Sequence, residues 1–174
     1  MPEVTADDHT LGPAGALVTV LEYGDYECPF CRGAYRDVHR MLDLYPGSIL
    51  FAFRNFPIQQ LHPHAEQAAE AAEAAAAQGR FWPMHGLLFE NQRRLGDRDL
   101  RGYAEQLGLG LERFDRDLAD HVHAPRVHED FLSGVRSGVN GTPTFYVNGV
   151  RYDDSYELET LHAALEGAAA SQRG

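Results

Sequence analysis

The sequence predicts an α/β fold with a single sheet, and two observations carry this prediction. Two β-rich segments, residues 16–23 and 49–56, flank a segment with helical spacing, an order typical of a parallel βαβ unit. Residues 62–137 contain several helical patterns and no convincing strand, and strand signals return only at residue 144. We therefore expect strands from both ends of the chain, separated in sequence by a helical block.

The expected βαβ unit begins with the apolar run 16–23 and continues into a helix over residues 28–45. Pro46-Gly47 then stops the helical pattern. The second strand, 49–56, is rich in β-formers and ends at Pro57. The helical side chains that recur at three- and four-residue intervals are Phe30, Ala34, Tyr35, Val38, Met41, Leu42 and Tyr45.

Five helices are predicted in the helical block. The alanine-rich run 65–77 comes first, closed by Gly79, and residues 81–91 form the second. Asp97 is expected to be the N-cap of the third helix. A short fourth helix and a fifth, from about residue 125 to 138, follow. Their apolar positions, expected in the core, are Leu100, Tyr103, Ala104, Leu107, Leu111, Phe114, Leu118, Val127, Phe131 and Val135.

The last part of the chain predicts a hairpin and a helix. Residues 144–147 and 150–152 are β-rich and are joined by Asn148-Gly149, which is a strong signal for a tight antiparallel turn. A final helix carrying Leu158, Leu161, Ala164 and Leu165 should end in a frayed polar segment at residues 171–174.

Cys28 and Cys31, the only cysteines, stand between the first strand and its helix as Cys28-Pro29-Phe30-Cys31. A structural disulfide over four residues would remove denatured-state entropy worth only about 2 kcal/mol, and a chain of 174 residues does not depend on that. A zinc site needs more ligands, and histidines at positions 62, 64, 121 or 123 would have to supply them. We therefore expect a redox dithiol and no metal.

Composition excludes several classes of function. The net charge of −11 opposes binding to nucleic acid, and no apolar window of about 18 residues predicts insertion into a membrane. All 15 basic residues are arginine, which excludes lysine Schiff-base and P-loop chemistry. The acidic start is unlike a signal peptide, so we expect a cytoplasmic protein, or a periplasmic or secreted one if a leader has been removed.

Thr142-Pro143 stands directly before the first strand of the hairpin. A proline at the start of a strand is tolerated because its missing N–H does not break the ladder. A cis Thr142-Pro143 bond is the alternative interpretation, and it would present backbone groups to a neighbouring site.

A strand, Cys-Pro-Phe-Cys, a helical block, Gly-Thr-Pro-Thr-Phe, a hairpin and a final helix together resemble the DsbA-like thiol:disulfide oxidoreductases. The resemblance covers nearly the whole chain. It implies a thioredoxin fold (βαβ plus ββα) interrupted by a helical insertion domain. The core would comprise residues 1–61 and 138–174, and the insertion residues 62–137.

The resemblance also implies roles for individual residues. Cys28 would be the exposed nucleophile and Cys31 the more buried resolving thiol, with Thr142 and Pro143 binding substrate beside them. A helix N-terminus stabilises a thiolate and supports the same order. Glu22 matches the buried acid of the family and would relay a proton for Cys31, while Pro29 and Phe30 complete the motif. Strongly oxidising members carry histidine where this chain has Phe30, so we predict a less oxidising couple.

We therefore predict a disulfide oxidoreductase that needs no cofactor beyond a Cys28–Cys31 disulfide. Its substrate would be a thiol- or disulfide-containing protein or a small thiol, with a separate redox partner. A peptide-binding or chaperone protein is one alternative, and a glutathione-dependent transferase or isomerase is another. The direction of exchange stays open, as does the sign of the effect of the flanking acids Asp25 and Glu27 on Cys28.

Overall fold

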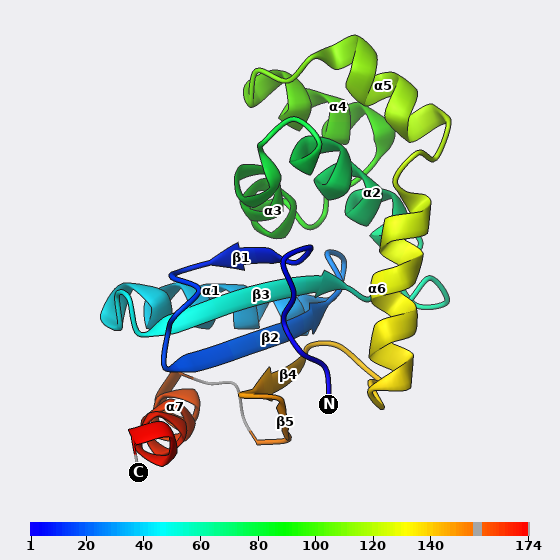
Figure 1. The fold of residues 1–174 in the computed structure, drawn as a ribbon. Helices are drawn as coiled ribbons and strands as arrows, with labels where there is room; N and C mark the ends of the chain where they lie inside the picture. The colour runs from blue at the N-terminus through cyan, green and yellow to red at the C-terminus, as the bar shows by residue number, and fades with distance from the viewer. Residues whose placement is uncertain (155–157, 174) are drawn as a thin grey trace.

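The computed structural model describes residues 1–154 and 158–173 and confirms an α/β fold around one five-stranded sheet (Figure 1). The strand order is β1-β3-β2-β4-β5, and only the pair of β2 with β3 is parallel. The strands are β1 (His9–Leu11), β2 (Val18–Gly24), β3 (Ile49–Asn55), β4 (Thr144–Val147) and β5 (Val150–Tyr152).

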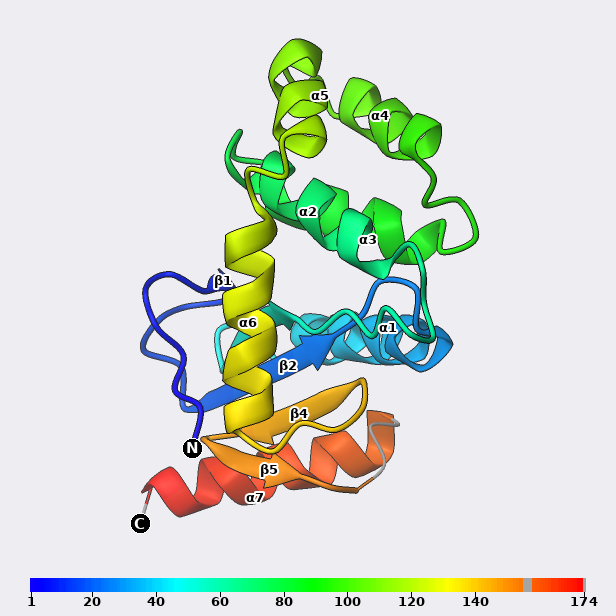
Figure 2. The same cartoon turned by 90° about the vertical axis from the view of Figure 1, so that its right-hand side faces the viewer.

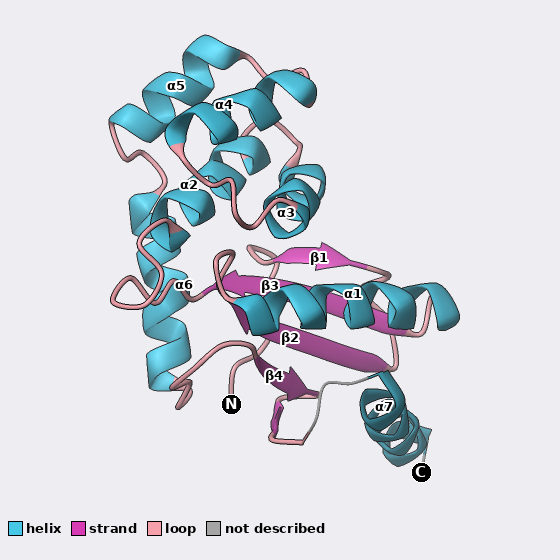
Figure 3. Cartoon of the chain, turned by 180° about the vertical axis from the view of Figure 1, so that it is seen from behind, coloured by secondary structure: helices cyan, strands magenta, loops and turns pink. Residues whose placement is uncertain are grey.

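The seven helices of the described residues cover the sheet and extend above it. In Figure 3, α1 crosses the face of the sheet that is turned to the viewer, and in Figure 2 α6 crosses the opposite face. Helices α2 to α5 gather at one end of the molecule, as Figure 1 shows. The bounds are α1 (Pro29–Leu44), α2 (Ala65–Ala76), α3 (Phe81–Glu90), α4 (Asp97–Gln106), α5 (Leu111–Ala119), α6 (Ala124–Arg136) and α7 (Leu158–Arg173).

Alternation along β2 divides the core between the two faces of the sheet. Val18 and Val20 pack with the α1 side chains, whereas Leu21 and Tyr23 pack with Phe56 on the side of α6. A strand with both faces buried needs apolar residues at successive positions, which is the pattern the sequence shows. Glu22 is the exception, because it is a carboxylic acid on the α1 side of this buried strand.

Strand β1 was not predicted from the sequence. This strand has only three residues, and it pairs antiparallel with β3 through His9 and Phe53, Thr10 and Ala52, and Leu11 and Phe51. A segment so short carries no periodicity, so long-range pairing alone makes it a strand.

Three details of the predicted helices were wrong. The N-cap of α4 is Gly96, and Asp97 is the first helical residue. Val135 is 50% exposed because α6 approaches the sheet through Gly134, where a Cβ would lie 2.6 Å from the Phe56 ring. The expected frayed end is helical through Arg173. Residue 174 and the side chains of Leu158 and Leu161 lie outside the described residues.

The division into a core of residues 1–61 and 138–174 and an insertion of 62–137 stays a prediction.

Among the described helices, none combines the length and the apolar character required to cross a membrane.

Candidate active site

The two cysteines lie at the start of α1, where the loop that leaves β2 enters the helix. Cys28 is the N-cap with an extended backbone (φ −74°, ψ 121°), and Pro29 opens the helix, where its missing N–H has no intrahelical partner to lose. Cys31 follows in the first turn. We call residues 25–28 the dithiol loop.

Thr142 and Pro143 lie against this loop because β4 pairs with β2. The pairing of Tyr23 with Thr144 brings the residues before β4 to the end of β2. The Thr142–Pro143 peptide bond is cis, and the Cys28 thiol donates to the Thr142 carbonyl oxygen at 3.4 Å. Residues 114 positions apart in sequence thus meet at one sulfur atom.

The expectation that Cys28 is exposed was wrong. Its exposed fraction is 3%, and that of Cys31 is 0%. The Cys28 side chain lies against the backbone of Thr142, whose carbonyl oxygen accepts its thiol hydrogen, and Gln92 contacts the Cys28 carbonyl oxygen. Both thiols are free and not joined in a disulfide.

The pKa of Cys28 is lowered to about 6. The largest cause is a hydrogen bond from the Cys31 thiol, and the Thr142 side chain and the N–H groups of Cys31 and Phe30 act in the same direction, while burial opposes them. The Thr142 hydroxyl is buried and has no hydrogen-bond partner among the described residues. Its donor is therefore free for the thiolate.

The carboxylates of the flanking acids Asp25 and Glu27 have hydrogen-bond partners other than the sulfur atoms. Asp25 accepts hydrogen bonds from the N–H groups of Glu27 and Ile58 and pairs with His62, and Glu27 pairs with His64. The structure thus brings both histidines beside the dithiol loop, but as partners of carboxylates. These pairs fasten residues 58–64 to the dithiol loop.

The pKa of Cys31 is raised, first by burial and then by its hydrogen bond to Cys28. The negative charges of Glu22 and Cys28 add to the rise, and the N–H of Asp25, 3.4 Å from the Cys31 sulfur, opposes it. The two thiols therefore differ strongly in acidity, since the same hydrogen bond stabilises one thiolate and holds the proton of the other.

Glu22 is 1% exposed, and its Oε1 has no hydrogen-bond partner among the described residues. Burial raises its pKa to about 8, and the charge of Cys28 contributes to the rise. Glu22 therefore keeps its proton at neutral pH.

Two contacts to the dithiol loop escaped the sequence analysis, and both come from the helical block. The Tyr26 hydroxyl is hydrogen-bonded to Nδ1 of His85 on α3 at 2.9 Å. Gln92, just after α3, donates from Nε2 to the carbonyl oxygens of Tyr26 (2.9 Å) and Cys28 (2.6 Å). A lone glutamine more than 60 residues away carries no local signal that could have revealed it.

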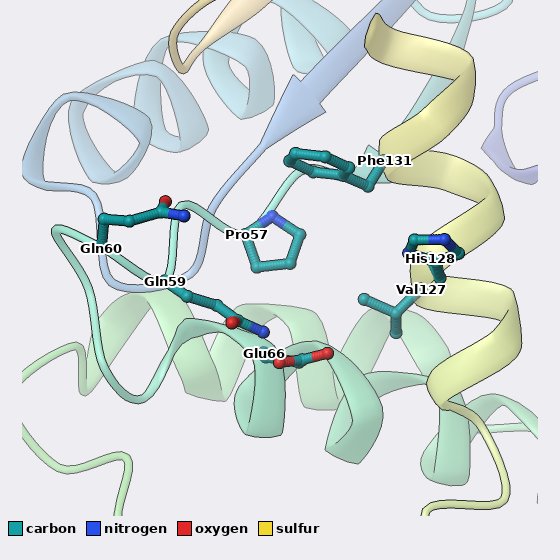
Figure 4. Close-up of a pocket in the computed structure, with 7 residues that line it drawn as sticks. All are labelled: Pro57, Gln59, Gln60, Glu66, Val127, His128 and Phe131. Atoms are coloured by element: carbon teal, nitrogen blue, oxygen red, sulfur yellow. The ribbon is translucent and has the colours of Figure 1, made fainter.

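A cavity of about 200 Å³ lies between residues 57–60, the start of α2, and α6 (Figure 4). None of the predicted site residues lines it. Pro57 and Phe131 form apolar walls, and Glu66 and His128 stand at its polar side. The dithiol, and not this cavity, is therefore the candidate active site.

Replacing Thr142 with valine is expected to raise the pKa of Cys28, because the isosteric side chain removes a donor to the thiolate. Thiolate absorbance in the ultraviolet, titrated against pH in the reduced protein, measures the change. Thr144→Val is the matched control, because the Thr144 hydroxyl donates to the Gly141 carbonyl oxygen and not to sulfur. Equal titration curves for wild type and Thr142→Val would contradict the assignment.

A buried dithiol at a helix start, facing a cis-proline loop on a mixed sheet, defines the class of thioredoxin-fold oxidoreductases. The family described as thioredoxin matches residues 4–167, and the chain belongs to this family. The resemblance to DsbA-like proteins is confirmed.

Solved structures show the same fold. Oxidised BdbD from Bacillus subtilis is 25% identical, with a TM-score of 0.81 over 92% of each chain. A thioredoxin-like oxidoreductase from Silicibacter pomeroyi DSS-3 is 29% identical, with a TM-score of 0.81 over 95% of this chain and 94% of that one. Wolbachia pipientis α-DsbA1 is 18% identical with a TM-score of 0.82, covering 97% of this chain and 94% of that one, and shows the fold alone.

The curated relatives that the chain matches have names unlike those of the solved structures. A protein named Na(+)/H(+) antiporter NhaA 1 from Salinispora arenicola is 49% identical over 95% of this chain. One named Na(+)/H(+) antiporter NhaA from Herminiimonas arsenicoxydans is 41% identical over 99% of it. The chain spans 25% and 26% of their lengths, so the likeness concerns about a quarter of each relative.

Proposed function

We propose that the chain exchanges disulfides with a thiol- or disulfide-containing protein or a small thiol through Cys28 and Cys31. The observation that carries the proposal is the geometry of the dithiol, because Cys28 is the N-cap of α1 and its sulfur meets the loop with the cis Thr142–Pro143 bond. This environment lowers the pKa of Cys28 to about 6 and raises that of Cys31. At neutral pH Cys28 is largely a thiolate, which is the reactive form. Cys31 keeps its proton until it attacks Cys28 in the second step of the exchange.

In the reducing direction, the Cys28 thiolate attacks one sulfur of a substrate disulfide. A bond forms between Cys28 and that sulfur, the substrate S–S bond breaks, and the other substrate sulfur leaves as a thiolate that takes up a proton. Cys31 then loses its proton and attacks Cys28, which releases the second substrate thiol. Two electrons pass from the dithiol to the substrate, and the reverse sequence oxidises a substrate dithiol.

The surrounding residues have supporting roles in this proposal. Glu22, which is buried on β2 and whose charge acts on Cys31, relays a proton for Cys31: one carboxyl oxygen takes up the proton that Cys31 loses as the other oxygen gives up the proton that Glu22 held. Thr142 and Pro143 bind the substrate backbone beside Cys28. Phe30 is 64% exposed at the start of α1 and gives no side-chain donor to the thiolate. The prediction that this couple is less oxidising than those of family members with histidine at this position stays part of the proposal. A separate redox partner returns the Cys28–Cys31 pair to its starting redox state.

The proposal is tested with oxidised glutathione as the probe. Cys31→Ser is expected to accumulate a mixed disulfide with one glutathione, visible by intact mass, because the resolving thiol is gone. Cys28→Ser is expected to form no such adduct, since the raised pKa of Cys31 keeps its thiol protonated at neutral pH. The equilibrium of the wild type in glutathione buffers then gives the reduction potential and the direction of exchange.

Retention of exchange by Cys28→Ser would contradict the proposal. The double variant Cys28→Ser, Cys31→Ser separates the alternatives, because a peptide-binding protein would keep its cellular function without either thiol. The cytoplasmic location expected from the start of the chain stays a prediction.

A further inference from the structure

The dithiol loop is held from the helical block as well as from the sheet. Tyr26 packs its ring against Phe89 of α3, with the ring centroids 4.8 Å apart, and its hydroxyl is hydrogen-bonded to His85. Both Tyr26 and His85 are almost fully buried. Helix α3 and the dithiol loop therefore form one packed unit, although they belong to different parts of the sequence.

Gln92 extends from the end of this unit to the nucleophile. Asn91 is the C-cap of α3, with its N–H donating to the Leu87 carbonyl oxygen, so the position of Gln92 is set by the helix end. Both Gln92 hydrogen bonds start from Nε2, and an amide nitrogen has two protons to donate. One side-chain amide thus spans the carbonyl groups on both sides of Glu27.

The orientation of the Cys28 carbonyl group affects the geometry at the start of α1. It is the first acceptor of α1, receiving the N–H of Arg32 at 3.2 Å, and it fixes the peptide plane that leads into the helix. The N–H groups of Phe30 and Cys31, which face the Cys28 sulfur, follow within the next turn. A donor on this carbonyl also offsets a negative partial charge close to the thiolate.

We propose that Gln92 is a positioning residue for the dithiol: by holding the carbonyl groups of Tyr26 and Cys28, it keeps the start of α1 aligned on the Cys28 sulfur. The helical block then acts on the acidity of the nucleophile. This inference rests on the proposed function, and it assigns to one residue of the block a role in setting the redox equilibrium.

The test compares Gln92→Met, which keeps the length of the side chain and removes the donor, with Gln92→Ala. The Cys28 pKa is measured by the pH dependence of alkylation with iodoacetamide, and the redox equilibrium in glutathione buffers. We expect the pKa of Cys28 to rise. From a starting value of about 6, a rise of one unit makes the equilibrium constant for reduction by glutathione about fivefold smaller at pH 7.

Gln78→Met is the matched control. Gln78 also lies in the helical block and also clamps backbone, donating to the Gly110 carbonyl oxygen and accepting the Gly110 N–H, but far along the chain from the dithiol loop. We expect this variant to titrate as the wild type. An unchanged Cys28 pKa in the Gln92 variants, or an equal shift in Gln78→Met, overturns the proposal.

Folding is checked by circular dichroism. Failure of both Gln92 variants to fold also overturns the proposal, because the hydrogen bonds would then serve the fold and not the alignment of the dithiol. Failure of the proposed function is distinguishable, since a wild type that exchanges no disulfide with glutathione can still be titrated by alkylation.

Discussion

Replacing Glu22 with glutamine is expected to stabilise the reduced protein, and the gain is expected to grow as the pH rises from about 4.5 to about 8. The folded pKa is raised to about 8 from an ordinary value of 4.5, chiefly by burial. Between these values the unfolded chain has released the proton and the folded protein still holds it, so wild-type stability falls with rising pH. At about 1.4 kcal/mol per pKa unit, the loss has an upper bound of about 5 kcal/mol.

Denaturant unfolding of both proteins at a series of pH values measures this effect. The difference between them reports the ionisation of Glu22 together with its coupling to the charge of Cys28. Glu112→Gln, on the exposed side of α5, is the control and is expected to follow the wild type. Parallel stability curves for Glu22→Gln and wild type would show that the carboxyl group ionises freely in the folded state.

Arg54→Met is expected to cost about 3–5 kcal/mol of unfolding free energy, because it leaves a buried carboxylate without its partner. Nε and Nη2 of Arg54 form hydrogen bonds of 2.7 and 2.8 Å to the two carboxylate oxygens of Asp8, whose side chain is 3% exposed. The same guanidinium donates to the Tyr23 hydroxyl and to the Glu3 carbonyl oxygen. It thus joins the N-terminal segment to β2 and β3.

Urea unfolding checks this value. The exposed pair of Arg136 and Glu129 provides the control, since Arg136→Met removes a surface ion pair worth about 0–1 kcal/mol. The double variant Arg54→Met, Asp8→Leu is expected to recover part of the loss, because apolar replacement of both partners leaves no buried charge. A single variant as stable as wild type would show that Asp8 reaches solvent without Arg54.

The sequence predicted the elements whose evidence is local. The βαβ unit, the five central helices and the Asn148-Gly149 hairpin follow from periodicity and turn chemistry, and Asn148 and Gly149 both have the positive φ that this turn requires (49° and 78°). The dithiol and Thr142-Pro143 could be found because each is a short motif. Their meeting at the Cys28 sulfur required the resemblance to a family.

What the sequence did not predict depends on contacts between distant segments. β1 is a strand only because β3 offers it an edge, and Val135 is exposed only because Gly134 makes the close contact. Thr142, which contacts the Cys28 sulfur, lies 114 residues from Cys28 in the sequence. Gln92, which donates to the Cys28 carbonyl oxygen, lies 64 residues away. The periodicity of apolar residues cannot predict such contacts, because it indicates which face of an element is apolar and not what packs against that face.

The central place of β2 has a consequence for exchange with solvent. This strand is hydrogen-bonded on both sides, to β3 and to β4, and amides in such strands exchange their hydrogens only when the whole domain unfolds. Glu22 stands on this slowest-opening element, whereas Cys28 stands at a helix start that local fluctuations can free. Under the proposed function, small openings of the dithiol loop would admit a substrate sulfur while Glu22 stays buried in the sheet.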